Sequence, residues 1–165
     1  MKKTLIFLLI ILCSGFVFYS CKEDDECRTD RYVRMYAFFK RLSIVDGDTT
    51  TVTLRIDTLS IHGLGVNTML YDTVVNKDSV RLPLNKFADM SQFVFNVKDS
   101  IIDTISIYHI NKEEYLSFEC GILTTFIIDK ERTTSTNHYI DSISVKQDTV
   151  DARNAEHIYI YHTPR

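Results

Sequence analysis

Hydrophobic and polar side chains alternate along most of this chain, and the period-two pattern is the strongest constraint on its fold. Between residues 51 and 57, Val52, Leu54 and Ile56 share one side, while Thr, Arg and Asp residues share the other. Successive side chains of a β-strand point to opposite faces, so the pattern predicts a half-buried strand. Further strands are predicted at 31–41, 58–62, 79–84, 92–97, 103–110, 114–120, 122–128, 139–146 and 156–162.

Turn-forming residues separate these segments, and no stretch keeps a helical period beyond a single turn near residues 85–91. Turns are predicted at 46–48, 63–65, 76–78, 111–112 and 133–137. About eight to ten short strands with regular turns predict an all-β fold, an immunoglobulin-like or related β-sandwich. A partly closed β-barrel is the alternative. Pro83 has no N–H to donate, so its strand is expected at a sheet edge.

The first 20 residues have the pattern of an export signal. Lys2 and Lys3 precede an apolar run from residue 5 to 12. Ser20 before Cys21 resembles the lipobox of bacterial lipoproteins, although Phe18 stands where that motif usually has Leu. We therefore expect cleavage after residue 20 and a lipid on the Cys21 thiol. The alternative is that residues 4–20 stay as a short transmembrane anchor.

A charged run directly follows the predicted lipidation site. Such runs are usually solvated tethers, and residues 21–30 are expected to form one. The order of the run also resembles the export signal that Bacteroidota place behind a lipidated cysteine, which implies a cell-surface location on the outer membrane. An orientation toward the periplasm is the alternative. The run consists of Lys22, Glu23, Asp24, Asp25 and Glu26.

Removal of the signal leaves 145 residues, enough for one domain at 31–165. That part has 17 basic and 22 acidic residues, so its charge gives no support to nucleic-acid binding. Cys27 and Cys120 form an even pair in an oxidising compartment, which predicts a disulfide. The bridge would close a loop of 94 residues. Two free thiols are the alternative.

A tripeptide of Asp, then Ser or Thr, then an aliphatic residue or Thr uses eight of the 15 aspartates. One interpretation is structural, because Asp ends turns and β-branched residues begin strands. The tripeptide also resembles the O-glycosylation sequon of Bacteroidota, and Thr49 and Thr149 are the preferred sites because both are expected in loops. The candidate hydroxyls are Thr49, Thr58, Thr73, Ser79, Ser100, Thr104, Ser142 and Thr149.

Motifs for catalysis, phosphate binding or metal binding are not found, so we expect no enzyme, no cofactor and no metal. The five histidines are interpreted as surface or rim residues. Tyr159 and Tyr161 alternate with isoleucines in the last strand, and Tyr32 and Tyr36 share a face of the first. Such rows can bind sugars, but packing of the tyrosine face by the other sheet is the preferred interpretation.

The expected mature chain, from residue 21 on, resembles an uncharacterised lipoprotein family of Bacteroidota, a domain of unknown function. The resemblance rests on residues 27–30, 82–85, 114–121 and 158–161. It implies a small β protein of the envelope and supplies no catalytic residues. The expected function is that of a non-enzymatic accessory subunit that docks on an outer-membrane barrel or another envelope protein. A surface glycan-binding module is the alternative.

Overall fold

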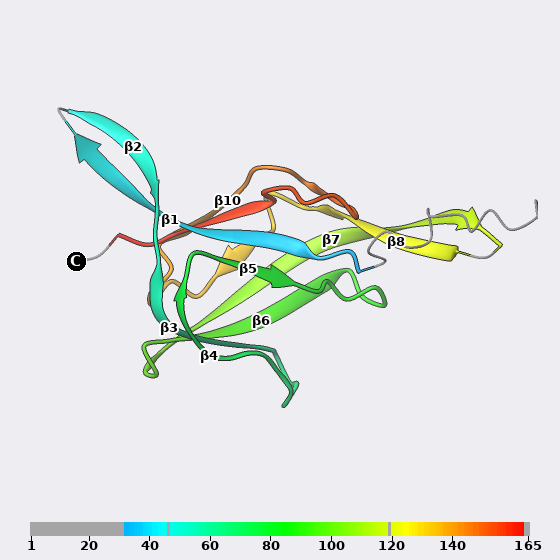
Figure 1. The fold of residues 1–165 in the computed structure, drawn as a ribbon, viewed down its shortest axis with the longest axis horizontal. Helices are drawn as coiled ribbons and strands as arrows, with labels where there is room; N and C mark the ends of the chain where they lie inside the picture. The colour runs from blue at the N-terminus through cyan, green and yellow to red at the C-terminus, as the bar shows by residue number, and fades with distance from the viewer. Residues whose placement is uncertain (1–31, 46, 119, 164–165) are drawn as a thin grey trace, which may run out of the picture.

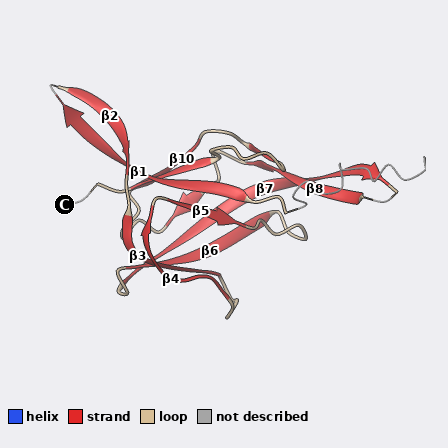
Figure 2. Ribbon diagram, viewed as in Figure 1, coloured by secondary structure: helices blue, strands red, loops and turns tan. Residues whose placement is uncertain are grey.

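The computed structural model describes residues 32–45, 47–118 and 120–163. The predicted signal, Cys21, the charged run Lys22–Glu26 and Cys27 lie outside the described residues. Within those ranges the chain contains strands and loops and no helix, as Figure 2 shows. Two separate sheets pack face to face, which confirms the predicted all-β sandwich in preference to the partly closed barrel.

The smaller sheet contains five strands in the order β10-β12-β1-β2, with β5 also paired to β1. The first and last strands lie parallel in its centre, with Ala37 beside Ile158. β2 and β5 share the opposite edge of β1, so the prediction of an edge position for the strand before Pro83 is confirmed. The bounds are β1 (Met35–Val45), β2 (Asp48–Thr53), β5 (Ser79–Leu82), β10 (Ser142–Val145) and β12 (Ile158–Tyr161).

The larger sheet contains seven strands in the order β11-β8-β7-β6-β3-β4, and the short β9 pairs with β7. Its described neighbours are all antiparallel. The bounds are β3 (Ile56–Gly63), β4 (Met69–Lys77), β6 (Met90–Val97), β7 (Ile101–Ser117), β8 (Gly121–Ile128), β9 (Thr134–Ser135) and β11 (Thr149–Val150).

The core lies between the facing sides of the two sheets. Phe39 of β1 meets Phe95 of β6 edge-to-face, with ring centroids 6.4 Å apart. Ile158 and Ile160 of β12 are fully buried, while Tyr159 and Tyr161, which alternate with them, are not. Alternation therefore selects the inner face of each strand, and burial of that face provides most of the stabilisation.

Several predicted boundaries are wrong because strand pairing overrides the local pattern. The run 51–57 is divided, since β2 ends at Thr53 in one sheet and β3 begins at Ile56 in the other. The predicted turn at 111–112 is absent, because β7 continues through it to Ser117 and pairs with β8. Cys120 therefore lies in the turn after β7 and not in a strand. The nine-residue β4 was not predicted.

Two hairpins project from opposite ends of the sandwich, as Figure 1 shows. One is formed by β1 and β2. The other, which we call the β7–β8 arm, comprises residues 110–123 and extends past the remaining strands. The start of β1 lies at the same end as the β7–β8 arm, so the chain enters the domain at that end.

Candidate functional site: an apolar pocket at one end of the sandwich

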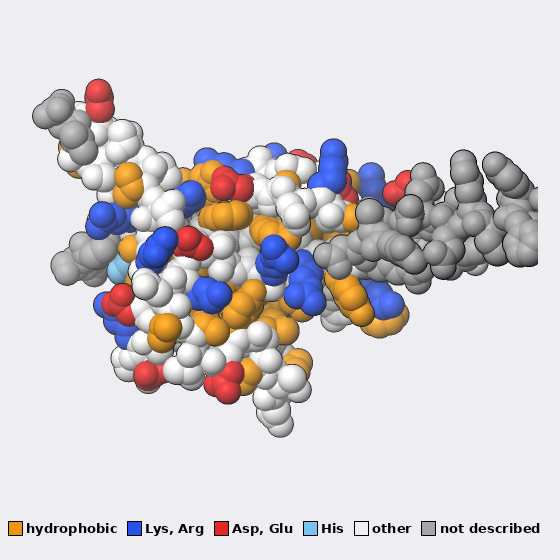
Figure 3. All heavy atoms as spheres, in the orientation of Figure 1, with side chains coloured by type: hydrophobic (Ala, Val, Ile, Leu, Met, Phe, Trp, Pro, Cys, Tyr) orange, Lys and Arg blue, Asp and Glu red, His pale blue; other side chains and the backbone are white. Residues whose placement is uncertain are grey.

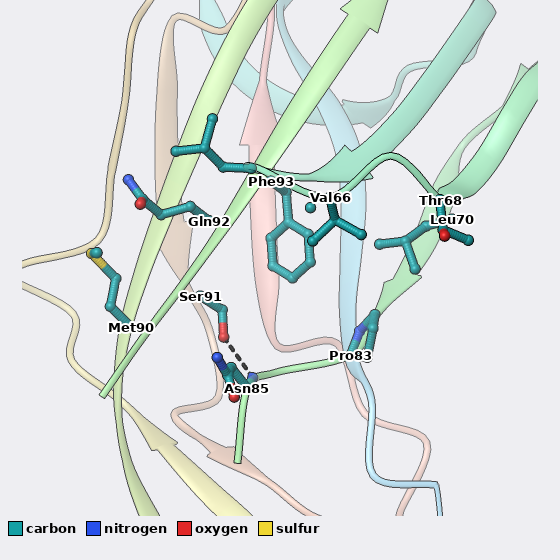
Figure 4. Close-up of a pocket in the computed structure, with 11 residues that line it drawn as sticks. Val66, Thr68, Leu70, Pro83, Asn85, Met90, Ser91, Gln92 and Phe93 are labelled. Atoms are coloured by element: carbon teal, nitrogen blue, oxygen red, sulfur yellow. Dashed lines mark hydrogen bonds between the residues drawn. The ribbon is translucent and has the colours of Figure 1, made fainter. Parts of the chain in front are cut away.

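A pocket of about 440 Å³ opens between the β3–β4 loop and the β5–β6 loop. Leu64, Val66 and Leu70 come from the first loop and the start of β4, and Pro83 follows β5. Figure 4 shows the Phe93 ring of β6 between Val66 and Ser91. Such a volume is within the range of small-ligand sites. The lining is mainly apolar and also carries Thr68, Asn85, Ser91 and Gln92, so it favours a mainly apolar side chain or small ligand.

The sequence around Gly63 shapes one wall of the pocket. Gly65 has a φ of +76°, a conformation that other residues adopt only with strain, and it turns the chain back toward β4. The Val66 N–H donates to the Gly63 carbonyl at 3.0 Å, and the Leu64 N–H donates to the Gln92 carbonyl of β6 at 3.0 Å. These two hydrogen bonds fix the β3–β4 loop, and the exposed side chains of Leu64 and Val66 therefore line the pocket.

A buried polar chain holds the opposite wall. The Ser91 hydroxyl accepts the backbone N–H of Asn85 at 2.7 Å, as Figure 4 shows, and lies 2.8 Å from His109 Nε2. His109 Nδ1 lies 2.7 Å from Asn111 Oδ1. The Asn111 amide donates to the Ala88 carbonyl at 2.9 Å. The chain therefore connects β6 and β7 to both ends of the β5–β6 loop.

These contacts define the state of His109. Burial lowers its pKa below the ordinary value of 6.5, against the opposing effects of Asn111 and Asp89, so the ring is neutral near pH 7. Since Asn111 Oδ1 accepts, Nδ1 carries the proton and Nε2 accepts the Ser91 hydroxyl proton. In an activated serine the hydroxyl likewise donates its proton to a histidine nitrogen. Ser91 and His109, however, are buried, and their hydrogen bonds hold the β5–β6 loop in place. We assign them a structural role.

A second candidate surface lies on the outer face of the smaller sheet, which we call the aromatic–basic face. The register places Phe38 beside Tyr159 and Tyr36 beside Arg81. The Arg81 guanidinium lies 4.6 Å from the Tyr36 ring centre, and Lys40 and Lys146 lie 4.8 and 4.9 Å from that of Tyr159. Figure 3 shows basic and apolar side chains side by side over β1 and β5.

The aromatic–basic face corrects the preferred interpretation of the tyrosine rows. Tyr36, Tyr159 and Tyr161 are half-buried and face away from the other sheet, because the isoleucines of β12 face inward. The Tyr159 hydroxyl also bonds the Glu156 carboxylate. Tyr32 is exposed and lines the same small hollow as Tyr36 and Arg81.

Asp103 of β7 is fully buried and holds the segment before β10. Its carboxylate accepts the Thr136 hydroxyl at 2.6 Å and the three backbone N–H groups of residues 138 to 140 at 2.6 to 2.8 Å. Burial opposes ionisation, but these hydrogen bonds outweigh it and hold the pKa of Asp103 below 3.8. The aspartate of the tripeptide at 103–105 therefore has a structural role.

The predicted glycosylation hydroxyls are spread over both sheets. Thr49, Thr73, Ser100 and Ser142 are exposed, while Thr58, Ser79, Thr104 and Thr149 are half-buried. Neither Thr49 nor Thr149 lies in a loop, since they belong to β2 and β11. The Thr149, Ser79 and Thr73 hydroxyls donate to the preceding aspartates at 3.0 to 3.3 Å. Five of the eight tripeptides lie at strand starts, as the turn interpretation predicts.

Cys120 and two of the histidines complete the residues that the sequence singled out. Cys120 is buried in the turn before β8, and its N–H donates to Ser117 Oγ at 3.0 Å. Its predicted bridge to Cys27 stays a prediction. The interpretation of His109 and His157 as surface residues is wrong, because they are 3% and 0% exposed.

Sequence reasoning missed the pocket and its polar wall. The available signals were Gly63 and Gly65 flanking Leu64, and a histidine on the inward phase of β7, two residues before Asn111. Across the described ranges, no cluster of three or more His, Cys, Asp or Glu side chains could hold a metal ion. Over the same residues, no helix has the length and apolar character needed to cross a bilayer.

Residues 58–162, more than half of the chain, match the model of a family of unknown function, DUF6452. The chain belongs to this family. The match runs from β3 to the end of β12 and includes the pocket, Asp103 and the β7–β8 arm. No curated protein and no solved structure matches the chain significantly.

Proposed function

We propose that this chain is a lipid-anchored envelope protein whose sandwich docks, without catalysis, on a protein embedded in the outer membrane. The observation that carries the proposal is the apolar pocket at the end where the chain enters the domain. A soluble domain rarely leaves an apolar cavity uncovered unless it receives a ligand or a partner.

The predicted anchor places this pocket near the membrane. Ten residues lie between Cys21 and Tyr32, the first described residue, and a fully extended chain from Cys21 to Tyr32 spans at most about 40 Å. The pocket end therefore stays close to the bilayer, where a membrane-embedded partner is available. An exposed apolar side chain of that partner is the chemistry that Leu64, Val66 and Leu70 would bind.

Photo-crosslinking in intact cells tests the docking site. A benzophenone amino acid at Leu70, which lines the pocket, is compared with one at Val75, which is exposed on the same strand and does not line it. We expect a single membrane-protein adduct from position 70 and its loss when Val66→Asp is added. Equal adducts from both positions, or none from position 70, would contradict the proposal.

The anchor is tested separately. Metabolic labelling with a palmitate analogue should mark the wild type and not the Cys21→Ala variant. Protease treatment of intact cells should degrade the wild type, whereas a variant with residues 22–26 replaced by alanine should be protected if that run directs surface export. An unlabelled wild type would exclude the lipoprotein assignment.

The aromatic–basic face favours a second candidate, a module that binds acidic glycans. Aromatic rings stack on sugars, and the neighbouring Arg81, Lys40 and Lys146 would neutralise carboxylate or sulfate groups. Affinity electrophoresis on a panel of acidic and neutral polysaccharides tests this. Tyr159→Ala should abolish any retardation, while Tyr115→Ala, on the β7–β8 arm, should not.

A further inference from the structure

The β7–β8 arm ends in a cluster of uncovered apolar side chains. Phe118 is 95% exposed, Tyr115 60% and Ile122 62%, and Leu116 is also exposed. Tyr115 and Ile122 face each other across the hairpin, and the Phe118 ring meets Tyr115 edge-to-face at 5.9 Å. We call these four residues the arm tip.

Two arm-tip residues, Tyr115 and Ile122, continue the core face of the larger sheet beyond the point where the smaller sheet covers it, while Leu116 has the opposite phase. His109 and Phe126, further back on the same face, are buried. Tyr115 and Ile122 have the same phase but belong to the β7–β8 arm, which extends past the end of the sandwich. Their apolar character therefore serves no described packing within the domain.

We propose that the arm tip inserts into the interface of the same bilayer that holds the Cys21 lipid, and so orients the domain on the membrane. This rests on the proposed lipid anchor. Cys27 follows Cys21 by six residues, a reach of at most about 22 Å, and its predicted bridge to Cys120 would attach the tether two residues from Phe118. Tyr favours the membrane interface, and Phe and Leu are among the apolar side chains that interfacial segments bury.

The charges of the arm limit the depth of insertion. The three residues of β7 that directly precede Tyr115 are charged and exposed: Lys112, Glu113 and Glu114. From Glu114 to Phe118 the chain spans four residues, about 13 Å if extended, which suits insertion of roughly 5 to 10 Å at an interface. The carboxylates would then remain in water among the headgroups.

The chain has no tryptophan, so one substitution supplies a unique fluorescent reporter. Phe118→Trp places it at the arm tip. Ile44→Trp is the matched control, because Ile44 is 75% exposed on the β1–β2 hairpin at the opposite end. Both lipidated full-length proteins are reconstituted in phosphatidylcholine vesicles, with and without brominated acyl chains. Circular dichroism verifies that both fold.

We expect the Trp at position 118 to shift to shorter wavelength on vesicles and to be quenched several-fold more strongly by brominated lipid than the Trp at position 44. Adding Tyr115→Ser and Ile122→Ser should reduce that quenching. A protein that floats with vesicles but shows equal or no quenching at the two positions overturns the inference and leaves the lipid anchor intact.

Three other outcomes also overturn it. A blue-shifted Trp at position 118 without vesicles, independent of protein concentration, would show that the chain's own N-terminal segment covers the arm tip. A concentration-dependent shift would show a second copy there. A lipid-processed protein that does not float with vesicles would refute stable anchoring itself, and the inference with it.

Discussion

At the scale of single residues, the most constrained side chain is the Asp103 carboxylate. It is fully buried, and backbone N–H groups and the Thr136 hydroxyl stabilise its negative charge. His138 Nδ1 lies 3.2 Å away, but its ring is largely exposed. The charged form is therefore an integral part of the fold.

Replacing Asp103 by Asn should lower the free energy of unfolding by about 3 kcal/mol, because an amide offers one acceptor atom and presents its NH₂ to backbone donors. Urea denaturation at pH 7 measures this. Asp129→Asn, at an exposed turn where the carboxylate accepts two N–H groups, is the control and should cost much less. Equal losses would contradict the role of Asp103.

Exposure also separates the predicted glycosylation sites. A transferase needs access to the hydroxyl, so modification is expected at one or more of the exposed Thr49, Thr73, Ser100 and Ser142 and not at the half-buried Thr104 or Thr149. Peptide mass spectrometry of protein purified from its native envelope checks this. Sugar at the half-buried Thr104 would refute the access argument, and an unmodified chain would leave the tripeptides with their turn function alone.

At the scale of elements, the β5–β6 loop depends on the polar chain through Ser91, His109 and Asn111. Loops are usually the least stable parts of a β-sandwich. Here a neutral buried histidine fixes one of them against two strands. The pocket wall should therefore respond to pH.

Burial lowers the pKa values of His109 and His157 below 6.5 in the folded state. The unfolded state then binds more protons below pH 6.5, so stability should fall as the pH decreases from about 7 toward the folded pKa values and then level off. Urea unfolding at pH 7.5 and 5.5 measures the loss. A variant carrying H109Q and H157Q should be less stable at both pH values but show a smaller difference between them.

At the scale of the whole molecule, the two ends of the sandwich differ. The chain entry, the pocket and the arm tip share one end, whereas the β1–β2 hairpin occupies the other. A lipid anchor at Cys21 would place the first of these ends against the membrane. The predicted disulfide would attach that end to the tether at a second point.

Removing the predicted disulfide with Cys27→Ala and Cys120→Ala should lower the free energy of unfolding by about 4 to 5 kcal/mol in the chain-entropy model, because the bridge closes a long loop. Denaturation of the wild type with and without reductant gives an independent value. Alkylation of both thiols without prior reduction would show that the bridge is absent.

The sequence alone determined the fold class and the inner face of strands such as β12. Side-chain alternation has a period of two, so Ile158 and Ile160 had to share a face opposite Tyr159 and Tyr161. Pro83 likewise indicated an edge strand from its missing N–H alone. These are local properties, and no knowledge of partners is needed to read them.

Only the tertiary structure decided which strands pair and which polar groups are buried. Alternation does not specify a neighbour, so the parallel pairing of β1 with β12 and the division of residues 51–57 between two sheets were not predictable. Asp103 and His109 are polar residues, and the sequence alone gives no reason to expect them in the core. Their burial depends on donors and acceptors supplied by other strands and loops, up to 37 residues away, because a buried polar group is stable only where such partners meet it.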